Sequence, residues 1–293
     1  MKLAVLYLIA AAALYGSIST VAKPTLNSIN PILLTSLTYL IIGIVITFII
    51  KLTGHFYNPT ISDLKLIVLI SIWGAVLGPI LFFYGLSLTS ASLASILINA
   101  EFIFSIILAV SILKERPSAI GYAGIVLIFI GLLITNVDFD NLSLASDNTI
   151  VGNALIIAAS FFWAVDNNVS NIILKKGVTV TRIIQLKSLI RGSISMAICL
   201  CLSFSLTFKI GIEQVPNLII LGLGGFAGSL FLFLRGMKQV GTIKSVMIFS
   251  TSSIFGVIFA LLFLNEIYTE IWKLFLSSIV IVCGIFLITR ESK

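Results

Sequence analysis

Two acidic residues lie inside long apolar stretches of this chain, where ionisable side chains are rare. Glu101 is about ten residues into the run 91–112, and Asp166 lies in the run 150–170. A carboxylate facing lipid costs on the order of several kcal/mol, so each side chain must face protein or water. A carboxyl group in such surroundings can bind and release a proton, which is the chemistry of a proton- or cation-coupled site. For Glu101 the alternative is a structural hydrogen bond to a neighbouring helix.

Polar and aromatic residues accompany Asp166. Trp163 is three residues before it and Asn167 follows it, so one helix face would present an indole ring, a carboxylate and an amide. That face could line a cavity. Alternatively, these groups could clamp two helices together, each interhelical hydrogen bond contributing on the order of 0.6–2 kcal/mol.

Two basic residues also lie within an apolar run. Lys187 and Arg191 are four residues apart in the run 183–206, which places them on one helix face. Long basic side chains near a helix end usually extend toward the membrane surface, and we expect that here. The alternative is that they pair with Asp166 or Glu101, or with a carboxylate of a transported molecule.

The elements that must position these residues are membrane-spanning helices. Of the 293 residues, 59% are hydrophobic and 10% are charged, which is outside the range of soluble globular proteins. A helix needs about 20 apolar residues to cross a hydrocarbon core of ~30 Å. Ten candidate spans meet this description: 3–22, 32–50, 65–84, 91–112, 118–136, 150–170, 183–206, 217–234, 243–264 and 271–289.

The distribution of Lys and Arg predicts the orientation, because cytoplasmic loops collect these residues. With the N-terminus inside, most loop cations fall on the inner side, and the outer side holds only Lys23, Lys209 and Lys273. The central outer loop, 137–149, is acidic. Both termini are therefore expected in the cytoplasm.

An internal repeat divides the chain. Residues 82–115 recur in outline at 233–266, and both copies end on Leu-x-Glu, at Glu115 and Glu266. Five helices in each half is an odd number, so the halves would cross the membrane in opposite senses as an inverted pair. The predicted units are 1–137 and 150–293, joined by an outer linker at 138–149.

The repeat aligns further polar residues. Ser250 and Ser252 fall at the positions of Asn99 and Glu101, while Tyr15 falls at the position of Trp163. Polar centres at matching depth in both halves are typical of a transport site at the repeat interface. Ser and Thr also bond their own helix backbone, which is the structural alternative for the serines.

Glycine and glutamate residues at other positions favour structural roles. Gly74 with Gly78, and Gly224 with Gly228, have the spacing that lets helices approach closely. Glu115 and Glu266 lie at helix ends, where we expect them to cap a loop or to pair with a nearby cation. The candidate cations are Lys114, Arg116 and Lys273.

Three motifs carry a family resemblance. Ala-Ala-Leu-Tyr-Gly-Ser at 12–17, Phe-Tyr-Gly-Leu-x-x-Thr-Ser-Ala-Ser-x-Ala at 83–94 and Ile-Leu-Lys-Glu at 112–115 resemble the drug/metabolite transporter superfamily, in its EamA-like ten-helix branch. The resemblance covers nearly the whole chain. It implies a secondary transporter, often an exporter, of amino acids or similar small metabolites, with its cavity between the two halves. We expect it to work by alternating access. Family members usually carry a proline in the middle of the fourth and ninth helices, where this chain has Phe102 and Ser253, so no kink from that proline is expected.

Other functional classes find little support. The chain has no Gly-x-x-x-x-Gly-Lys-Ser/Thr motif for ATP and no Gly-x-Gly-Asp motif of an intramembrane protease, so no enzyme is expected. The three cysteines form no Cys-x-x-Cys and His55 is the single histidine, so neither a metal nor a cofactor is predicted. The net charge of +7 fits the inner loops rather than nucleic-acid binding.

The sequence therefore predicts an all-α, multi-pass protein of the cell membrane, monomeric or homodimeric, that carries a small molecule across the lipid bilayer. Its predicted transport site comprises Glu101, Asp166, Asn99, Trp163, Asn167, Tyr15, Ser250, Ser252 and Arg191. Protonation of Glu101 or Asp166 would couple transport to a proton. The alternative is a flippase for lipids or polyprenyl phosphates on the same fold, served by Lys187, Arg191 and the basic inner loops.

Overall fold

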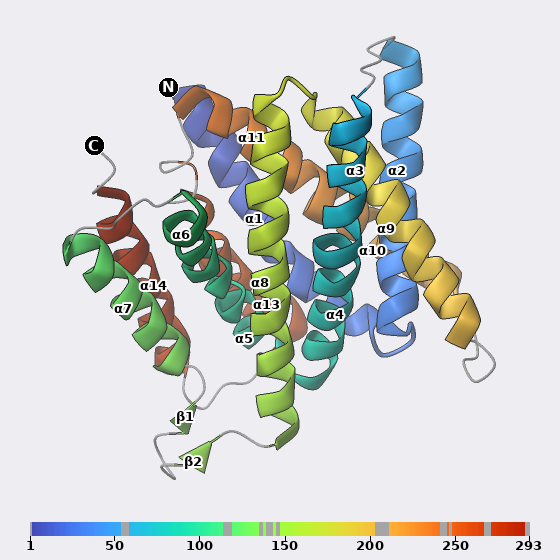
Figure 1. The fold of residues 1–293 in the computed structure, drawn as a ribbon. Helices are drawn as coiled ribbons and strands as arrows, with labels where there is room; N and C mark the ends of the chain where they lie inside the picture. Colours follow the sequence, from blue (N-terminus) through green and yellow to red (C-terminus); the bar gives the residue numbers. More distant parts are fainter. Residues whose placement is uncertain are drawn as a thin grey trace.

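The protein is a bundle of helices (Figure 1). The computed structural model describes residues 2–53, 59–113, 119–134, 137–138, 143–144, 147–202, 211–240, 245, 248–266 and 271–290. Among these residues, one small antiparallel pair of strands, β1 (Val137–Asp138) and β2 (Ser143–Leu144), lies in the central connection.

The helices of the first half are α1 (Lys2–Thr25), α2 (Pro31–Thr53), α3 (Ile61–Ile70), η1 (Ser71–Leu77), α4 (Gly78–Leu88), α5 (Ala91–Leu97), α6 (Ala100–Leu113) and α7 (Ala119–Ile134). Those of the second half are α8 (Asp147–Lys175), α9 (Val180–Leu202), η3 (Ile212–Gln214), α10 (Val215–Ile219), η4 (Ile220–Gly228), α11 (Ser229–Val240), α13 (Ser252–Leu264) and α14 (Ile271–Arg290). Both η1 and η4 are π-helices, which are rare and often found at functional sites.

Several helices are long and apolar enough to cross a membrane. Within the part of the chain that the structure describes, five meet both conditions: Leu3–Thr25, Pro31–Thr53, Asp147–Leu174, Val180–Leu202 and Val215–Gly236. Shorter apolar helices accompany them at Gly78–Leu88, Ala119–Gly131, Ser252–Leu264 and Trp272–Gly284. All of these lie within or across apolar runs identified in the sequence. Large apolar side chains also cover the outside, such as Phe48, Leu262 and Phe263, as expected for a surface in contact with lipid.

Helices of the two halves pack against each other throughout the bundle. The α2 helix packs on α9, and α7 packs on α14. In addition, α4 and α6 pack on α8, while α11 and α13 pack on α1. The π-helix η1 contacts α9, and η4 contacts α2. Figure 1 shows α7 and α14 side by side at the opposite end of the bundle from α2 and α9.

Glycines allow close approach in a reciprocal pattern. A Cβ at Gly43 would lie 2.6 Å from Leu189, and a Cβ at Gly192 would lie 2.8 Å from Leu40. The same exchange occurs between α7 and α14, where Gly131 meets Ile281 and Gly284 meets Ile128. Gly85 of α4 on Ile156 of α8 and Gly236 of α11 on Leu8 of α1 are similar close contacts in two different helix pairs. In the α2–α9 and α7–α14 pairs, each helix therefore needs a residue without a side chain at the crossing.

The fourth and ninth apolar runs are interrupted although neither contains a proline. Between α5 and α6, the Asn99 N–H donates to the Ile96 carbonyl at 3.1 Å. Before α13, the Thr251 N–H donates to the Ile248 carbonyl at 3.2 Å. The side chains of Asn99 and Thr251 donate to these same two carbonyls, at 2.9 and 2.6 Å. Polar side chains that bond the local backbone compete with the regular helix ladder and explain both interruptions.

Candidate functional site

A buried ion cluster joins α8 to α9. The Lys187 ammonium donates to Asp166 Oδ2 at 2.5 Å, and Arg191 Nη2 lies 3.7 Å from the same oxygen. All three residues are about 5% exposed. The expectation that these cations extend to the membrane surface is therefore wrong. A carboxylate one helix away provides a nearer partner than water does.

The cluster contains two cations and one carboxylate. Lys187 also donates to the Ser170 hydroxyl at 2.9 Å, so it has two firm partners. The Arg191 guanidinium lies over the Tyr39 ring, 4.0 Å from its centroid, in a cation–π contact with α2. Within the described part of the chain, Arg191 Nε and Asp166 Oδ1 have no hydrogen-bond partner.

Glu101 lies in a different environment from Asp166. It is in the first turn of α6, is half-buried, and accepts a hydrogen bond of 2.6 Å from the Asn167 side-chain amide on α8. Asn167 itself is exposed, which places the pair at the edge of the bundle. Glu101 therefore has a neutral partner and is half-buried, whereas Asp166 is buried and held by cations.

A row of aromatic rings begins at the ion cluster. Tyr39 contacts Phe226 of η4 with ring centroids 5.2 Å apart, and Phe226 lies 6.4 Å from Trp163 of α8. Trp163 in turn lies 6.4 Å from Tyr15 of α1, and Tyr15 lies 4.9 Å from Phe249. The row leads from Arg191 through the bundle to α1. Gly78 permits this packing, since a Cβ there would lie 2.7 Å from the Trp163 indole nitrogen.

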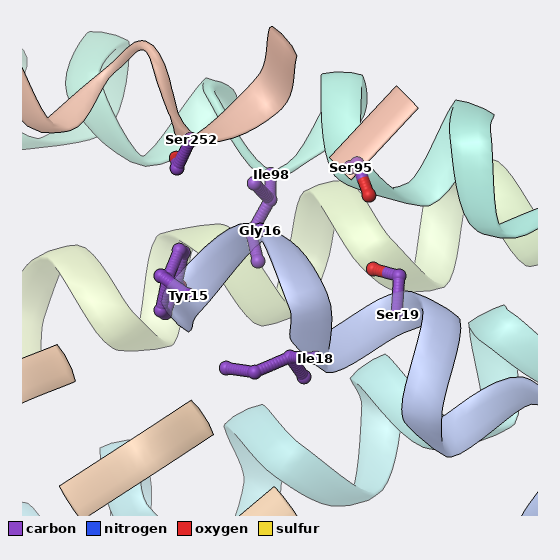
Figure 2. Close-up of a pocket in the computed structure, with 7 residues that line it drawn as sticks. All are labelled: Tyr15, Gly16, Ile18, Ser19, Ser95, Ile98 and Ser252. Carbon is purple, nitrogen blue, oxygen red and sulfur yellow. The ribbon is translucent and has the colours of Figure 1, made fainter. Parts of the chain in front are cut away.

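A small cavity lies at the far end of the row. Its lining residues are Tyr15, Gly16, Ile18 and Ser19 of α1, Ser95 of α5, Ile98 at the first helix interruption and Ser252 of α13. Figure 2 shows the Ser19 and Ser95 hydroxyls turned toward each other. The cavity of about 10 Å³ has room for roughly one water molecule. It adjoins both interrupted helices.

The predicted site residues fall into neighbouring groups. Asp166 meets Arg191, Glu101 meets Asn167, and Tyr15 meets Trp163. Ser252 joins Tyr15 in the cavity wall, and Ser250 is buried in the turn before α13. Asn99 is fully buried at the other interruption, and its Oδ1 accepts no hydrogen bond from the described residues.

The sequence interpretation missed four residues that the structure adds: Ser19, Ser95, Tyr39 and Phe226. One signal was available for Ser19. If Tyr15 is aligned with Trp163, Ser19 falls at the position of Asn167. The other three are common residues in apolar runs, and nothing in their spacing distinguishes them.

Glu266 and Lys23 hold the connection between α4 and α5. The Glu266 carboxylate accepts hydrogen bonds from the Ala91 N–H at 2.7 Å, the Ser92 N–H at 3.1 Å and the Ser92 hydroxyl at 2.6 Å. The Lys23 ammonium donates to the Leu86 and Thr89 carbonyls. Glu266 thus caps the α5 N-terminus, as expected for a loop-capping residue. Glu115 lies outside the described residues.

Comparison with known proteins agrees with this architecture. An uncharacterized transporter of Methanothermobacter thermautotrophicus is 28% identical over 299 residues, covering 98% of this chain and 86% of that protein. A protein known from a crystal structure is 18% identical and superposes with a TM-score of 0.69 over 97% of this chain and 95% of its own. That likeness concerns the fold alone. The sequence pattern of the EamA-like transporter family matches residues 2–137 and again residues 150–290, so this chain belongs to the EamA-like transporter family of multi-pass membrane proteins.

Proposed function

We propose that the protein is a secondary transporter, and in physiological use an exporter, of small metabolites such as amino acids or related compounds. A central site would open alternately to the two sides of the membrane. The family supports a membrane transporter of small molecules. The observation that carries the finer proposal is the meeting of polar groups from both halves at two interrupted helices, around a cavity lined by Tyr15, Ser19, Ser95 and Ser252.

In this proposal the ten predicted spans form two inverted repeats, 1–137 and 150–293. The reciprocal glycine contacts support it, because a two-fold axis in the membrane plane would exchange Gly43 on Leu189 for Gly192 on Leu40. The same operation would exchange η1 on α9 for η4 on α2, and α6 on α8 for α13 on α1. Each contact has a counterpart in the other half.

The interrupted helices are suited to binding a solute. A discontinuous helix presents backbone groups and helix ends to the middle of the bundle, where transporters commonly bind their substrates. The Asn99 Oδ1 atom, without a partner among the described residues, is one such group. The cavity is smaller than the ~300–1,000 Å³ of a typical ligand site, so in this proposal the site must widen before a metabolite enters.

Proton coupling is assigned to Glu101 rather than to Asp166. Asp166 is paired with Lys187 at 2.5 Å and has Arg191 at 3.7 Å. Glu101 is half-buried and has the neutral Asn167 amide as its partner. A proton could therefore bind to and leave Glu101 without breaking an ion pair.

Counterflow of labelled amino acids into proteoliposomes that contain an internal pH dye tests this function. Wild type is compared with Glu101→Gln and Asp166→Asn, and Glu213→Gln at an exposed position is the matched control. We expect saturable exchange in wild type and control, exchange without proton movement in Glu101→Gln, and loss of exchange in Asp166→Asn. Unchanged proton movement in Glu101→Gln would overturn the coupling assignment. Lipid scrambling without exchange of any amino acid would favour the flippase alternative.

A further inference from the structure

We propose that Arg191 binds an anionic group of the transported molecule, so that the substrate carries a carboxylate or another singly charged anion attached to an apolar body. This inference rests on the proposed transport function and specifies the substrate class of the same site. Its starting point is the surplus of positive charge in the buried cluster.

Arg191 has hydrogen-bonding capacity that the described residues do not use. A guanidinium carries five N–H donors in a planar fork that matches a carboxylate. The Lys187 ammonium hydrogen-bonds Asp166 Oδ2 at 2.5 Å, whereas Arg191 Nη2 lies 3.7 Å from the same oxygen, beyond hydrogen-bond distance. Its Nε has no partner among the described residues, although the side chain is only 8% exposed. The guanidinium carbon lies over the Tyr39 ring, 4.0 Å from its centroid.

The charges of the cluster do not balance. Lys187 and Arg191 together carry two positive charges, against one negative charge on Asp166. Burying an uncompensated charge is costly, so a second anion would stabilise this cluster. Glu101 is the other carboxyl group near Asp166, but it is bonded to Asn167 at the edge of the bundle. An incoming carboxylate would supply the missing charge and pair with Arg191 directly.

Packing alone does not account for these charges. Under the proposed repeat, Asp166, Lys187 and Arg191 correspond to Ile18, Thr38 and Ile42, all buried where α1 and α2 pack on η4, as α8 and α9 pack on η1. There Ile18 packs against Gly225, and the crossing contains no ion pair among the described residues. The same crossing geometry thus forms with uncharged side chains. The charged version provides something other than helix packing.

The surroundings of Arg191 indicate the rest of the substrate. The row Tyr39, Phe226, Trp163 and Tyr15 leads from the guanidinium to the hydroxyl-lined cavity. Aromatic faces bind apolar and aromatic groups well, and their rings can move apart as a site widens. A molecule with its anionic group at Arg191 would therefore place an apolar body along these rings.

The test uses pairs of compounds that differ only in charge. Purified full-length protein in detergent is titrated with 3-phenylpropionate and its amide, with benzenesulfonate and its sulfonamide, and with phenylalanine and its amide. Thermal unfolding reports binding, because a ligand that binds only the folded state raises Tm. We expect each compound that carries a carboxylate or sulfonate to bind wild type at least tenfold more tightly than its amide or sulfonamide.

Two variants and a control assign this preference to Arg191. Arg191→Met should abolish the preference, and Arg191→Lys, which keeps the charge but loses the planar fork, should weaken anion binding about tenfold. Arg235→Met is the control, since Arg235 is an exposed cation that also lies over an aromatic ring, that of Tyr7. It should leave the preference unchanged.

The outcomes separate this inference from the transport function. Equal binding of anions and amides by wild type, binding of neither, or an unchanged preference in Arg191→Lys would overturn the inference. Counterflow of amino acids that persists in that case would leave the transport function standing. Charge-selective binding without transport of any panel member would support the anion site and overturn the function.

Discussion

Two helix crossings in this molecule have similar packing and opposite chemistry. Where α8 and α9 pack on η1, the buried side chains are Asp166, Lys187 and Arg191. Where α1 and α2 pack on η4, the aligned side chains are Ile18, Thr38 and Ile42. The neutral crossing forms in the same bundle without an ion pair among the described residues. The difference teaches that the buried ion cluster belongs to one crossing and not to its counterpart, which fits the proposal that the cluster serves recognition rather than folding.

A second pair of contacts shows the same division. Glu101 on α6 bonds Asn167 on α8, and the aligned positions, Ser252 on α13 and Ser19 on α1, both line the cavity. The carboxyl–amide pair includes an exposed residue, Asn167, whereas the two serines face an internal space. One contact thus contains a titratable group, and the other consists of neutral hydrogen-bonding groups.

The largest effect is expected from placing a charge in the neutral crossing. Ile18→Asp would bury a carboxylate without a cation, at a cost of about 3–5 kcal/mol. Ile18→Val removes one methylene and should cost about 0.5–1.5 kcal/mol. Thermal unfolding in detergent measures both. Similar losses for the two variants would mean that the neutral crossing tolerates charge, and the contrast between the crossings would fail.

Removing the closest partner of Asp166 should be nearly as damaging. Lys187→Met leaves the carboxylate with Arg191 at 3.7 Å, and we expect a loss of about 3 kcal/mol in unfolding free energy. Adding Asp166→Asn should recover part of this loss, which a double-mutant cycle measures.

The aligned position supplies the control for that experiment. The Thr38 hydroxyl has no hydrogen-bond partner among the described residues, so Thr38→Val should change the unfolding free energy by less than about 1 kcal/mol. A large loss in Thr38→Val would contradict the view that this crossing is held by apolar packing.

Replacing the three charged residues by the side chains of the aligned neutral positions tests the comparison further. The triple variant Asp166→Ile, Lys187→Thr and Arg191→Ile should be as stable as wild type or more stable by about 1–4 kcal/mol, because apolar replacements of buried ion clusters often stabilise. Transport and anion binding should be lost. A triple variant that cannot fold would show that the cluster is needed for packing after all.

The smallest effect concerns an ion pair outside the bundle core. The Thr60 hydroxyl and then Lys176 hydrogen-bond the Asp63 carboxylate, which holds the pKa of Asp63 below its usual value. A lowered folded-state pKa contributes stability that is present above the ordinary value of about 3.9 and is lost as pH falls through the folded-state value.

The matching contact of the other half is neutral, because Gln214 donates to Ser28 at 2.9 Å. Unfolding measured against pH should therefore show an acid-dependent loss in wild type that Asp63→Asn reduces and Gln214→Ala does not. Equal acid sensitivity in wild type and Asp63→Asn would show that the Asp63 carboxylate does not cause the acid-dependent loss of stability.

Apolar continuity and local motifs carried much of the sequence-based prediction. Runs of apolar residues located the membrane helices, and the motif around Tyr15 and Gly85 pointed to the correct family. These signals are local, since a helix satisfies its own backbone in lipid.

The contacts between helices could not be read from one sequence. Lys187 was expected to reach the membrane surface because its position near a helix end says nothing of the carboxylate on α8. The interruptions at Asn99 and Thr251 were also missed, since they arise from side chains that bond the local backbone rather than from proline. Glu266 was correctly placed at a helix end, but its partner on α5 is distant in sequence.

The face that a helix turns toward its neighbours depends on its rotation about its own axis. The π-helices η1 and η4 change this rotation for the helices that follow them. Each adds residues to a turn, so the helix that follows is rotated relative to an uninterrupted α-helix by about 100° for every extra residue. That rotation brings Gly85 of α4 against Ile156, and Gly236 of α11 against Leu8. Deleting one residue from either segment would turn these glycines away from their partners. The length of each π-helix therefore fixes which face of the following helix meets the rest of the bundle.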